Sequence, residues 1–211
     1  MKKLALLVYP ECSLQEVMNL SRLFRWDYDI ETEVISSSLA PVKSEEGIWL
    51  QPKNTTDGFS MEDYVCLVLP GCSDFTEVFR DKRLLEFLGT FRDNHTFPVG
   101  AICGGPMLLA KAGLLKGKPF TASIYMDFFD FCPFLEKENY VPAPLVTAEN
   151  IVTAGGSNFN GFAVAMAHLL GLECPDRIFS GYMDDWTQED YEVYLPPEAV
   201  EEVKAAFSDE G

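Results

Sequence analysis

The sequence predicts an α/β protein in which a mostly parallel sheet is covered by helices on both faces. Short apolar runs rich in β-branched residues alternate with longer segments of helical periodicity. Turn residues end three of the apolar runs, at Tyr9-Pro10, Pro70-Gly71 and Cys103-Gly104-Gly105. The length of 211 residues and the 47% share of hydrophobic side chains suit one domain with a sizeable core.

The strands are expected where apolar side chains run without interruption. Core strands are predicted at Leu4 to Tyr9, Thr32 to Ser36, Val65 to Leu69 and Val99 to Ile102. Val146 to Thr153 predicts a hairpin, because Glu149-Asn150 interrupts an apolar run. A further short strand is expected to end at Ala122, after a turn rich in lysine and glycine.

The helices are expected where apolar residues recur every three or four positions. They are predicted at Leu14 to Trp26, Leu84 to Phe91, Gly104 to Leu115, Phe159 to Leu170 and Pro197 to Phe207. Residues 124–133 are crowded with aromatics and are interpreted as a satellite core cluster or, alternatively, as a cover over the sheet edge or a subunit contact. Residues 1–211 are expected to form a single domain, with an acidic C-terminal extension from about residue 172.

The charge balance narrows the classes of partner. With 33 acidic and 16 basic residues, the net charge of -17 argues against binding to nucleic acid or to an anionic membrane surface. The apolar run at Leu4 to Tyr9 is too short to span a bilayer. Six scattered cysteines without a C-x-x-C pair favour a reducing compartment, and a cytoplasmic location is expected. We expect no cofactor and no metal site.

Cys103 is the candidate nucleophile. Ala101 to Pro106 reads as a strand that runs into a glycine-rich helix start, which predicts a nucleophile elbow with the sulfur aimed outward. Backbone N–H groups and the helix dipole at such a turn favour the thiolate. The alternative, a buried and inert thiol at a strand end, is the usual reading of an isolated cysteine.

These residues resemble the ThiJ/PfpI superfamily. The resemblance rests on Ala101 to Pro106, on Ala112 to Lys118, on Leu69-Pro70-Gly71 and on Thr153 to Gly156, and it covers roughly residues 3–171. It implies a flavodoxin-like three-layer sandwich of the class I glutamine-amidotransferase type and a homodimer. It also implies that Cys103 and Glu16 are catalytic and that the backbones of Gly71, Cys72 and Gly104 form an oxyanion site.

The sequence departs from the family pattern at its histidines. Many members carry histidine directly after the cysteine, or supply one from a later strand, and these positions are Gly104 and Ser123 here. His95 precedes the strand that leads to Cys103, so we expect it near the opposite sheet edge. His168 lies in a helix, and no Cys-His dyad is expected. Peptide hydrolysis is therefore disfavoured, because it needs a group that protonates the leaving amine.

A second departure is Cys72, which stands where the family usually shows a second glycine. Cys72 and Cys12 are possible redox partners of Cys103, and a Cys72–Cys103 pair or a soft-metal pocket is the sharper hypothesis. Three unconnected loop cysteines are the simpler one. Glu16 is expected to have a raised pKa, since a protonated carboxyl group would donate a hydrogen bond to the thiolate.

Two functions agree with these residues. The first is glyoxalase- or deglycase-like action on small reactive carbonyls in a stress response, by a cysteine-dependent lyase of the glyoxalase III type or a hydrolase. The second is a thiol redox sensor or stress-responsive binding protein without turnover, in which Cys103 meets a small electrophile or oxidant. A cysteine peptidase or amidase is the weakest of the alternatives.

Overall fold

The computed structural model describes residues 2–179 and, beyond them, residues 187, 189, 192, 194–200 and 204. The chain separates into two compact units, residues 1–176 and 177–211. The sheet, the helices around it and all candidate site residues belong to the first unit. None of the described helices is long and apolar enough to cross a membrane.

The first unit is built on a sheet whose strand order is β5-β2-β1-β6-β7-β9-β8. Its strands are β1 (Lys3–Leu7), β2 (Thr32–Ser36), β5 (Asn54–Thr55), β6 (Tyr64–Leu69), β7 (Val99–Ile102), β8 (Leu145–Ala148) and β9 (Ile151–Ala154). Neighbouring strands are parallel except for the β8–β9 pair, which is antiparallel. A separate antiparallel pair joins β3 (Val42–Lys43) to β4 (Trp49–Leu50).

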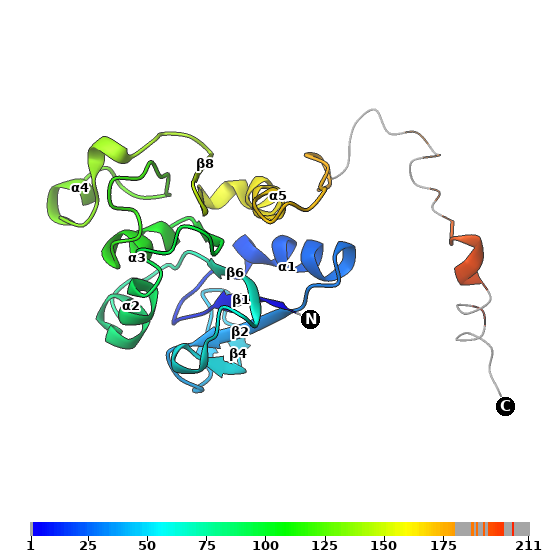
Figure 1. The fold of residues 1–211 in the computed structure, drawn as a ribbon, viewed down its shortest axis with the longest axis horizontal. Coiled ribbons are helices and arrows are strands. Elements are labelled where there is room, and N and C mark those ends of the chain that lie inside the picture. The colour runs from blue at the N-terminus through cyan, green and yellow to red at the C-terminus, as the bar shows by residue number, and fades with distance from the viewer. Residues whose placement is uncertain are drawn as a thin grey trace. The chain divides into compact units, whose positions relative to one another are not determined.

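Helices cover both faces of this sheet. They are α1 (Gln15–Asp27), α2 (Lys82–Gly89), α3 (Gly105–Lys111), the short α4 (Phe128–Phe131) and α5 (Phe159–Leu169). The β1-to-β2 connection and the β6-to-β7-to-β9 connections run in opposite directions across the sheet. Right-handed crossovers therefore place α1 on one face and α2 and α3 on the other. Helix α5 packs against α1, and α2 contacts α3 (Figure 1).

The main predicted elements are confirmed. The four core strands, the hairpin and the helices α1, α2, α3 and α5 are all present, with ends that differ by a few residues. The expected strand ending at Ala122 is reduced to one bridge between Phe120 and Tyr140. Of the helix expected from Pro197, Pro197–Ala199 form a 3₁₀ turn, and most of the remainder lies outside the described residues.

The aromatic segment forms α4 and the turn before it. Ring contacts join Phe128 to Tyr125 and to Phe131, while 75% of Tyr125 and 63% of Phe131 remain exposed. The segment is thus an aromatic cluster that keeps an open side.

The parallel strands bring several loops to one edge of the sheet. β6, β7 and β9 lie next to one another and end in the same direction, at Leu69, Ile102 and Ala154. The loops that follow begin with Pro70-Gly71, Cys103 and Gly155-Gly156. A catalytic site is expected at such an edge, since loops from separate strands converge there.

Candidate active site at the carboxyl edge of the sheet

Cys103 occupies the sharp turn that the sequence predicts between β7 and α3. Its φ angle is 59°, a left-handed conformation that is uncommon for a residue with a side chain. The turn is fixed on both sides, because the Cys103 N–H donates to the Ala154 carbonyl at 2.8 Å and the Cys103 carbonyl accepts from the Ser123 N–H at 2.8 Å. The half-buried thiol is therefore held in a defined position at the sheet edge.

Glu16 reaches the same position from the first turn of α1. Its side chain is buried, and its Oε2 atom accepts a 2.6 Å hydrogen bond from the Gly71 N–H. A further hydrogen bond joins its carboxyl group to the Cys103 thiol. Burial raises the pKa of Glu16, against the opposing effect of these two hydrogen bonds. The direction expected from the sequence is thus present, with burial as its main cause.

Two glycines form the walls around this pair. A Cβ atom on Gly71 would lie 2.7 Å from the Cys103 Cβ and 2.9 Å from the Glu16 Oε2. A Cβ on Gly156 would lie 3.0 Å from the Cys103 Sγ and 2.9 Å from the Glu16 Oε1. Both positions need glycine for this close approach, so the loops after β6 and β9 enclose the thiol and the carboxyl group.

The thiol form of Cys103 is strongly favoured in this setting. Burial, the charge of Glu16 and the hydrogen bond to Glu16 raise the pKa of Cys103 to about 12. The Gly104 N–H and the Ser123 hydroxyl act in the opposite direction but are outweighed. This corrects the expectation of a thiolate stabilised by backbone dipoles, because a carboxylate in contact with the sulfur disfavours a second negative charge.

Ser123 is a site residue to which the sequence analysis assigned no role. Its Oγ atom accepts from the Gly156 N–H at 2.9 Å, and its hydroxyl donates to the Cys103 sulfur. The available signal was its position, where some relatives supply a histidine. A hydroxyl group there stabilises developing negative charge on sulfur, although it cannot serve as a base near neutral pH.

The expected oxyanion groups take different roles. The Gly71 N–H binds Glu16, and the Gly104 N–H donates to the Cys103 sulfur. The Cys72 N–H has no hydrogen-bond partner among the described residues. Of the three predicted backbone donors, only Cys72 is thus without a hydrogen bond to the described part of the chain.

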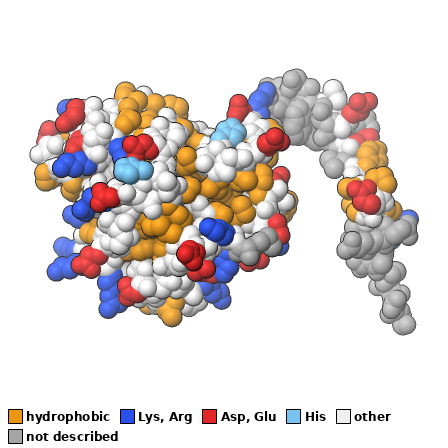
Figure 2. All heavy atoms as spheres, in the orientation of Figure 1, with side chains coloured by type: hydrophobic (Ala, Val, Ile, Leu, Met, Phe, Trp, Pro, Cys, Tyr) orange, Lys and Arg blue, Asp and Glu red, His pale blue; other side chains and the backbone are white. Residues whose placement is uncertain are grey.

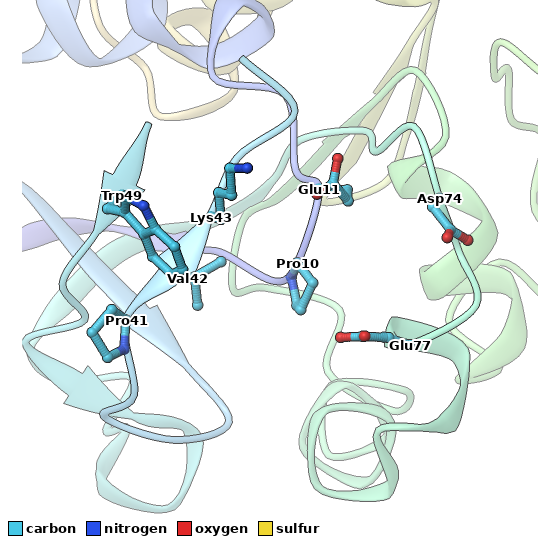
Figure 3. A pocket seen from close by; sticks show the side chains of 8 residues that line it. All are labelled: Pro10, Glu11, Pro41, Val42, Lys43, Trp49, Asp74 and Glu77. Carbon is cyan, nitrogen blue, oxygen red and sulfur yellow. The ribbon is translucent and has the colours of Figure 1, made fainter. Parts of the chain in front are cut away.

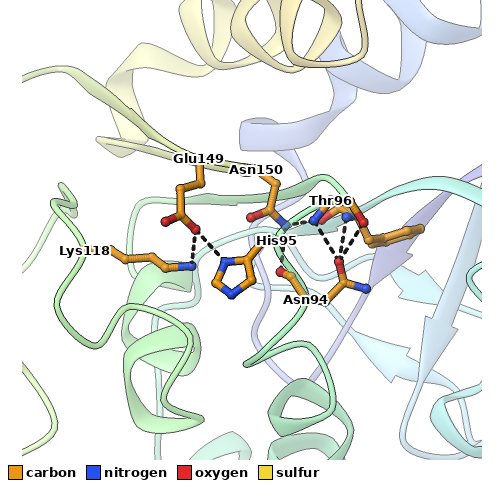
Figure 4. Close-up of polar contacts among 7 residues, drawn as sticks. Asn94, His95, Thr96, Lys118, Glu149 and Asn150 are labelled. Atoms are coloured by element: carbon orange, nitrogen blue, oxygen red, sulfur yellow. Dashed lines mark hydrogen bonds and ion pairs between the residues drawn. The ribbon is translucent and has the colours of Figure 1, made fainter.

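Both histidines lie away from the thiol. His95 Nδ1 is 2.9 Å from the Glu149 Oε2, beside Lys118 at the start of β9, which is the opposite edge of the sheet from Cys103 (Figure 4). His168 Nε2 is 2.8 Å from the Cys174 carbonyl. Both side chains are exposed, and Figure 2 shows histidine side chains at the surface. The absence of a Cys-His dyad is thereby explained by position.

The Phe75 ring explains why the residue after Cys103 is a glycine, Gly104. A Cβ atom on Gly104 would lie 2.3 Å from the Cζ atom of the Phe75 ring. The ring therefore takes the space that a side chain at position 104 would need. A histidine could not be accommodated there unless Phe75 moved.

The three site thiols are neighbours. Cys12 and Cys72 face one another in an isolated antiparallel bridge, and the Cys72 thiol interacts electrostatically with Cys103. All three thiols are free. Burial raises the pKa of Cys12 to about 11 and that of Cys72 to about 12. Within the described part of the chain, no three ligand-type side chains are arranged to hold a metal ion, so the soft-metal alternative gains no support.

A groove of about 440 Å³ lies beside these cysteines. Its lining includes Glu11, which precedes Cys12, and Asp74, which follows Cys72 by two positions, together with Lys43 and Trp49 (Figure 3). Neither Cys103 nor Glu16 lines it. The groove is therefore a feature next to the candidate active site and does not contain the reactive pair.

The sequence profile of the DJ-1/PfpI family matches residues 2–168. The chain belongs to the DJ-1/PfpI family. The DJ-1 superfamily protein Atu0886 from Agrobacterium tumefaciens has the same fold, with a TM-score of 0.73 at 25% identity over 84% of this chain and 94% of that one. The flavodoxin-like sandwich expected from the sequence is confirmed.

Curated relatives of this DJ-1/PfpI chain carry different names. The isonitrile hydratase of Pseudomonas putida is 28% identical over 149 residues, which cover 69% of this chain and 62% of that enzyme. The uncharacterized protease YdeA of Bacillus subtilis is 26% identical over 181 residues, which cover 84% of this chain and 88% of that protein. The chain spans only 62% and 56% of the length of two of the curated relatives that it matches.

Proposed function

We propose that this DJ-1/PfpI protein is an enzyme in which Cys103 adds to a small electrophilic carbon and Glu16 carries the proton. The observation behind this proposal is the hydrogen-bonded thiol–carboxyl pair, buried between two glycine walls. A carboxylate whose pKa is raised is a better base for the thiol proton than an ordinary glutamate. It can therefore take the proton from the thiol during addition and return it to the alkoxide that forms.

With an α-oxoaldehyde, the sulfur bonds to the aldehyde carbon while the S–H proton moves to Glu16. The alkoxide then takes that proton and becomes a hemithioacetal hydroxyl. A proton next leaves the former aldehyde carbon for Glu16 and is returned to the adjacent carbon, while the hemithioacetal hydroxyl proton moves to the neighbouring oxygen. The result is a thioester of a 2-hydroxy acid. Water hydrolyses the thioester and restores the thiol. One carbon is oxidised and its neighbour is reduced, so no external oxidant is needed.

Hydration of an isonitrile is the second candidate, favoured by the relative of that name. The terminal carbon of an isonitrile is also a small electrophile, and adding one water to it gives a formamide. Both reactions require a soft nucleophile and one proton carrier. Peptide hydrolysis, suggested by the name of the Bacillus relative, is disfavoured because neither histidine lies beside Cys103 to protonate a leaving amine.

The test is turnover of methylglyoxal and of an alkyl isonitrile by the full chain, with lactate and the formamide measured directly. We expect one of the two products to form catalytically. Cys103→Ser should abolish turnover, and Glu16→Gln should lower kcat by about 10²- to 10⁴-fold. Cys174→Ser is the matched control and should leave the rate unchanged, because Cys174 lies near the end of the first unit, outside the site.

Stoichiometric modification of Cys103 without product would contradict the enzyme proposal and favour the sensor. Turnover that survives in Cys103→Ser would also contradict it.

The cytoplasmic location and the homodimer stay predictions. The open side of the aromatic cluster around Phe128 supports a subunit contact there, since exposed aromatic groups of this kind are common at interfaces.

A further inference from the structure

The pairing between Cys12 and Cys72 has a specific register. The Ser13 N–H donates to the Gly71 carbonyl at 2.9 Å, and the Ser73 N–H donates to the Glu11 carbonyl at 3.1 Å. These two hydrogen bonds flank the cysteines, so Cys12 and Cys72 form the non-hydrogen-bonded pair of a short antiparallel ladder. Directly opposed residues in such a ladder project their side chains to the same face.

This register suits a disulfide. The Cα atoms of a non-hydrogen-bonded pair are typically about 4.5 Å apart. That separation falls within the range of roughly 4.4–6.8 Å in which two cysteines are bridged without backbone movement. The Cys12 carbonyl accepts from the Glu45 N–H at 3.1 Å, on the side away from Cys72. This hydrogen bond fixes the Cys12 backbone opposite Cys72.

Cys103 is less well placed as a partner for Cys72. The Cβ direction of Gly71 points at the Cys103 sulfur, at 3.0 Å. Side chains of successive residues in an extended segment point to opposite sides, so the Cys72 side chain leaves the segment on the other side from this Cβ direction, although its thiol still interacts electrostatically with Cys103. The Cys103 thiol is in addition hydrogen-bonded to Glu16. The three thiols are close together, but the register favours only the Cys12–Cys72 pair.

We propose that Cys12 and Cys72 are a redox-active pair that forms an intramolecular disulfide beside the active site. Two S–H bonds break and one S–S bond forms. The two electrons and two protons pass to an oxidant, such as hydrogen peroxide, which becomes two molecules of water. Cys72 is partly exposed and provides the entry point, whereas Cys12 is fully buried behind it. The pairing leaves Cys103 as a free thiol.

The position of Gly71 connects this pair to the catalytic groups. Gly71 precedes Cys72, and its N–H holds the Glu16 carboxylate. A disulfide at Cys72 would fix the segment that carries this N–H. The pair is thus placed to respond to oxidants without consuming the nucleophile.

The test is oxidation of the folded, full-length protein with diamide, which takes up the two hydrogen atoms, followed by alkylation, tryptic digestion and mass spectrometry without reduction. Cys12 lies on peptide 4–22, Cys72 on peptide 54–80 and Cys103 on peptide 93–111. We expect peptides 4–22 and 54–80 to become linked, and the link to disappear with dithiothreitol. Peptide 54–80 also carries Cys66, so fragment ions must assign the link to Cys72.

Three variants make the outcome decisive. The link should persist undiminished in Cys103→Ser and disappear in both Cys12→Ser and Cys72→Ser. The Cys103→Ser variant keeps the test valid if either of the other two folds poorly. A link between peptides 54–80 and 93–111 in place of the expected one would overturn the proposal. So would recovery of Cys12 and Cys72 as alkylated thiols after oxidation and unfolding.

Discussion

At the scale of single residues, the site depends on where one proton resides. Cys103 and Glu16 are hydrogen-bonded to each other and share burial, so loss of the proton from one opposes loss from the other. Burial, together with the carboxylate charge, raises the pKa of the thiol to about 12, which leaves the proton on sulfur at neutral pH. An electrophile changes this balance, because a sulfur atom that is forming a bond to carbon becomes far more acidic.

Glu16→Gln removes the charge and should shift the midpoint of Cys103 alkylation against pH. A like charge in contact typically changes a pKa by about 1 to 3 units, so the midpoint should move to lower pH by that amount. Below its pKa the thiol reacts in proportion to its thiolate fraction, so the curve of iodoacetamide labelling rate of peptide 93–111 from pH 7 to pH 10 moves along the pH axis with the midpoint, without the midpoint itself being reached. A shift to higher pH would mean that Glu16 is protonated and donates to a thiolate in the native protein.

Ser123→Ala is the matched comparison for this curve. It removes a hydrogen-bond donor to the sulfur and leaves the carboxyl group in place, so the same midpoint should move to higher pH. Opposite shifts in the two variants would separate the effect of charge from a general loosening of the site. A loosened site would move both curves in the same direction, toward the pKa of an exposed thiol.

At the scale of elements, the strand that leads to Cys103 is held in place because α5 packs closely onto β7. Gly100 lies in β7, and a Cβ atom there would approach the Met166 Sδ to 2.6 Å and the Phe162 Cζ to 2.8 Å. Both side chains are fully buried and have little room to move. The missing side chain at position 100 therefore sets the distance between this helix and the strand that carries Cys103.

Gly100→Ala should lower the free energy of unfolding by about 1–3 kcal/mol, the usual cost of overpacking a core. Urea denaturation followed by tryptophan fluorescence measures the change. Gly89→Ala is the control for the loss of a glycine without overpacking, since a Cβ atom there comes no closer than 3.7 Å to another group, the Arg92 Nη2. Equal stability of Gly100→Ala and the native chain would show that α5 can move without cost.

At the scale of the whole molecule, the sequence predicts those features that depend on neighbours in the chain. The strands, the crossover helices and the turn at Cys103 follow from local patterns of apolar residues and glycine. The Cys12–Cys72 register and the contact of Phe75 with Gly104 depend on segments far apart in the sequence, so no local pattern indicates them. The raised pKa of Cys103 has the same origin, because its burial and the charge of Glu16 both come from segments far away in the sequence.

Acidic side chains act electrostatically on the site. The net charge is -17, and the carboxylates of Glu45 and Glu46 both act to raise the pKa of Glu16. A negative field of this kind repels anions and leaves neutral molecules unaffected. The protein should therefore discriminate between electrophiles by charge, independently of any enzymatic turnover.

Iodoacetamide and iodoacetate test this discrimination, because they alkylate thiols by the same chemistry and differ in charge. At low salt, Cys103 should react at least about tenfold more slowly with iodoacetate, relative to the same ratio for a small free thiol. Screening should reduce the difference as the ionic strength rises toward 1 M. The double variant Glu45→Gln and Glu46→Gln should reduce the difference between the two reagents at low salt. A ratio that equals that of the free thiol at every salt concentration would mean that the acidic groups do not govern access to Cys103.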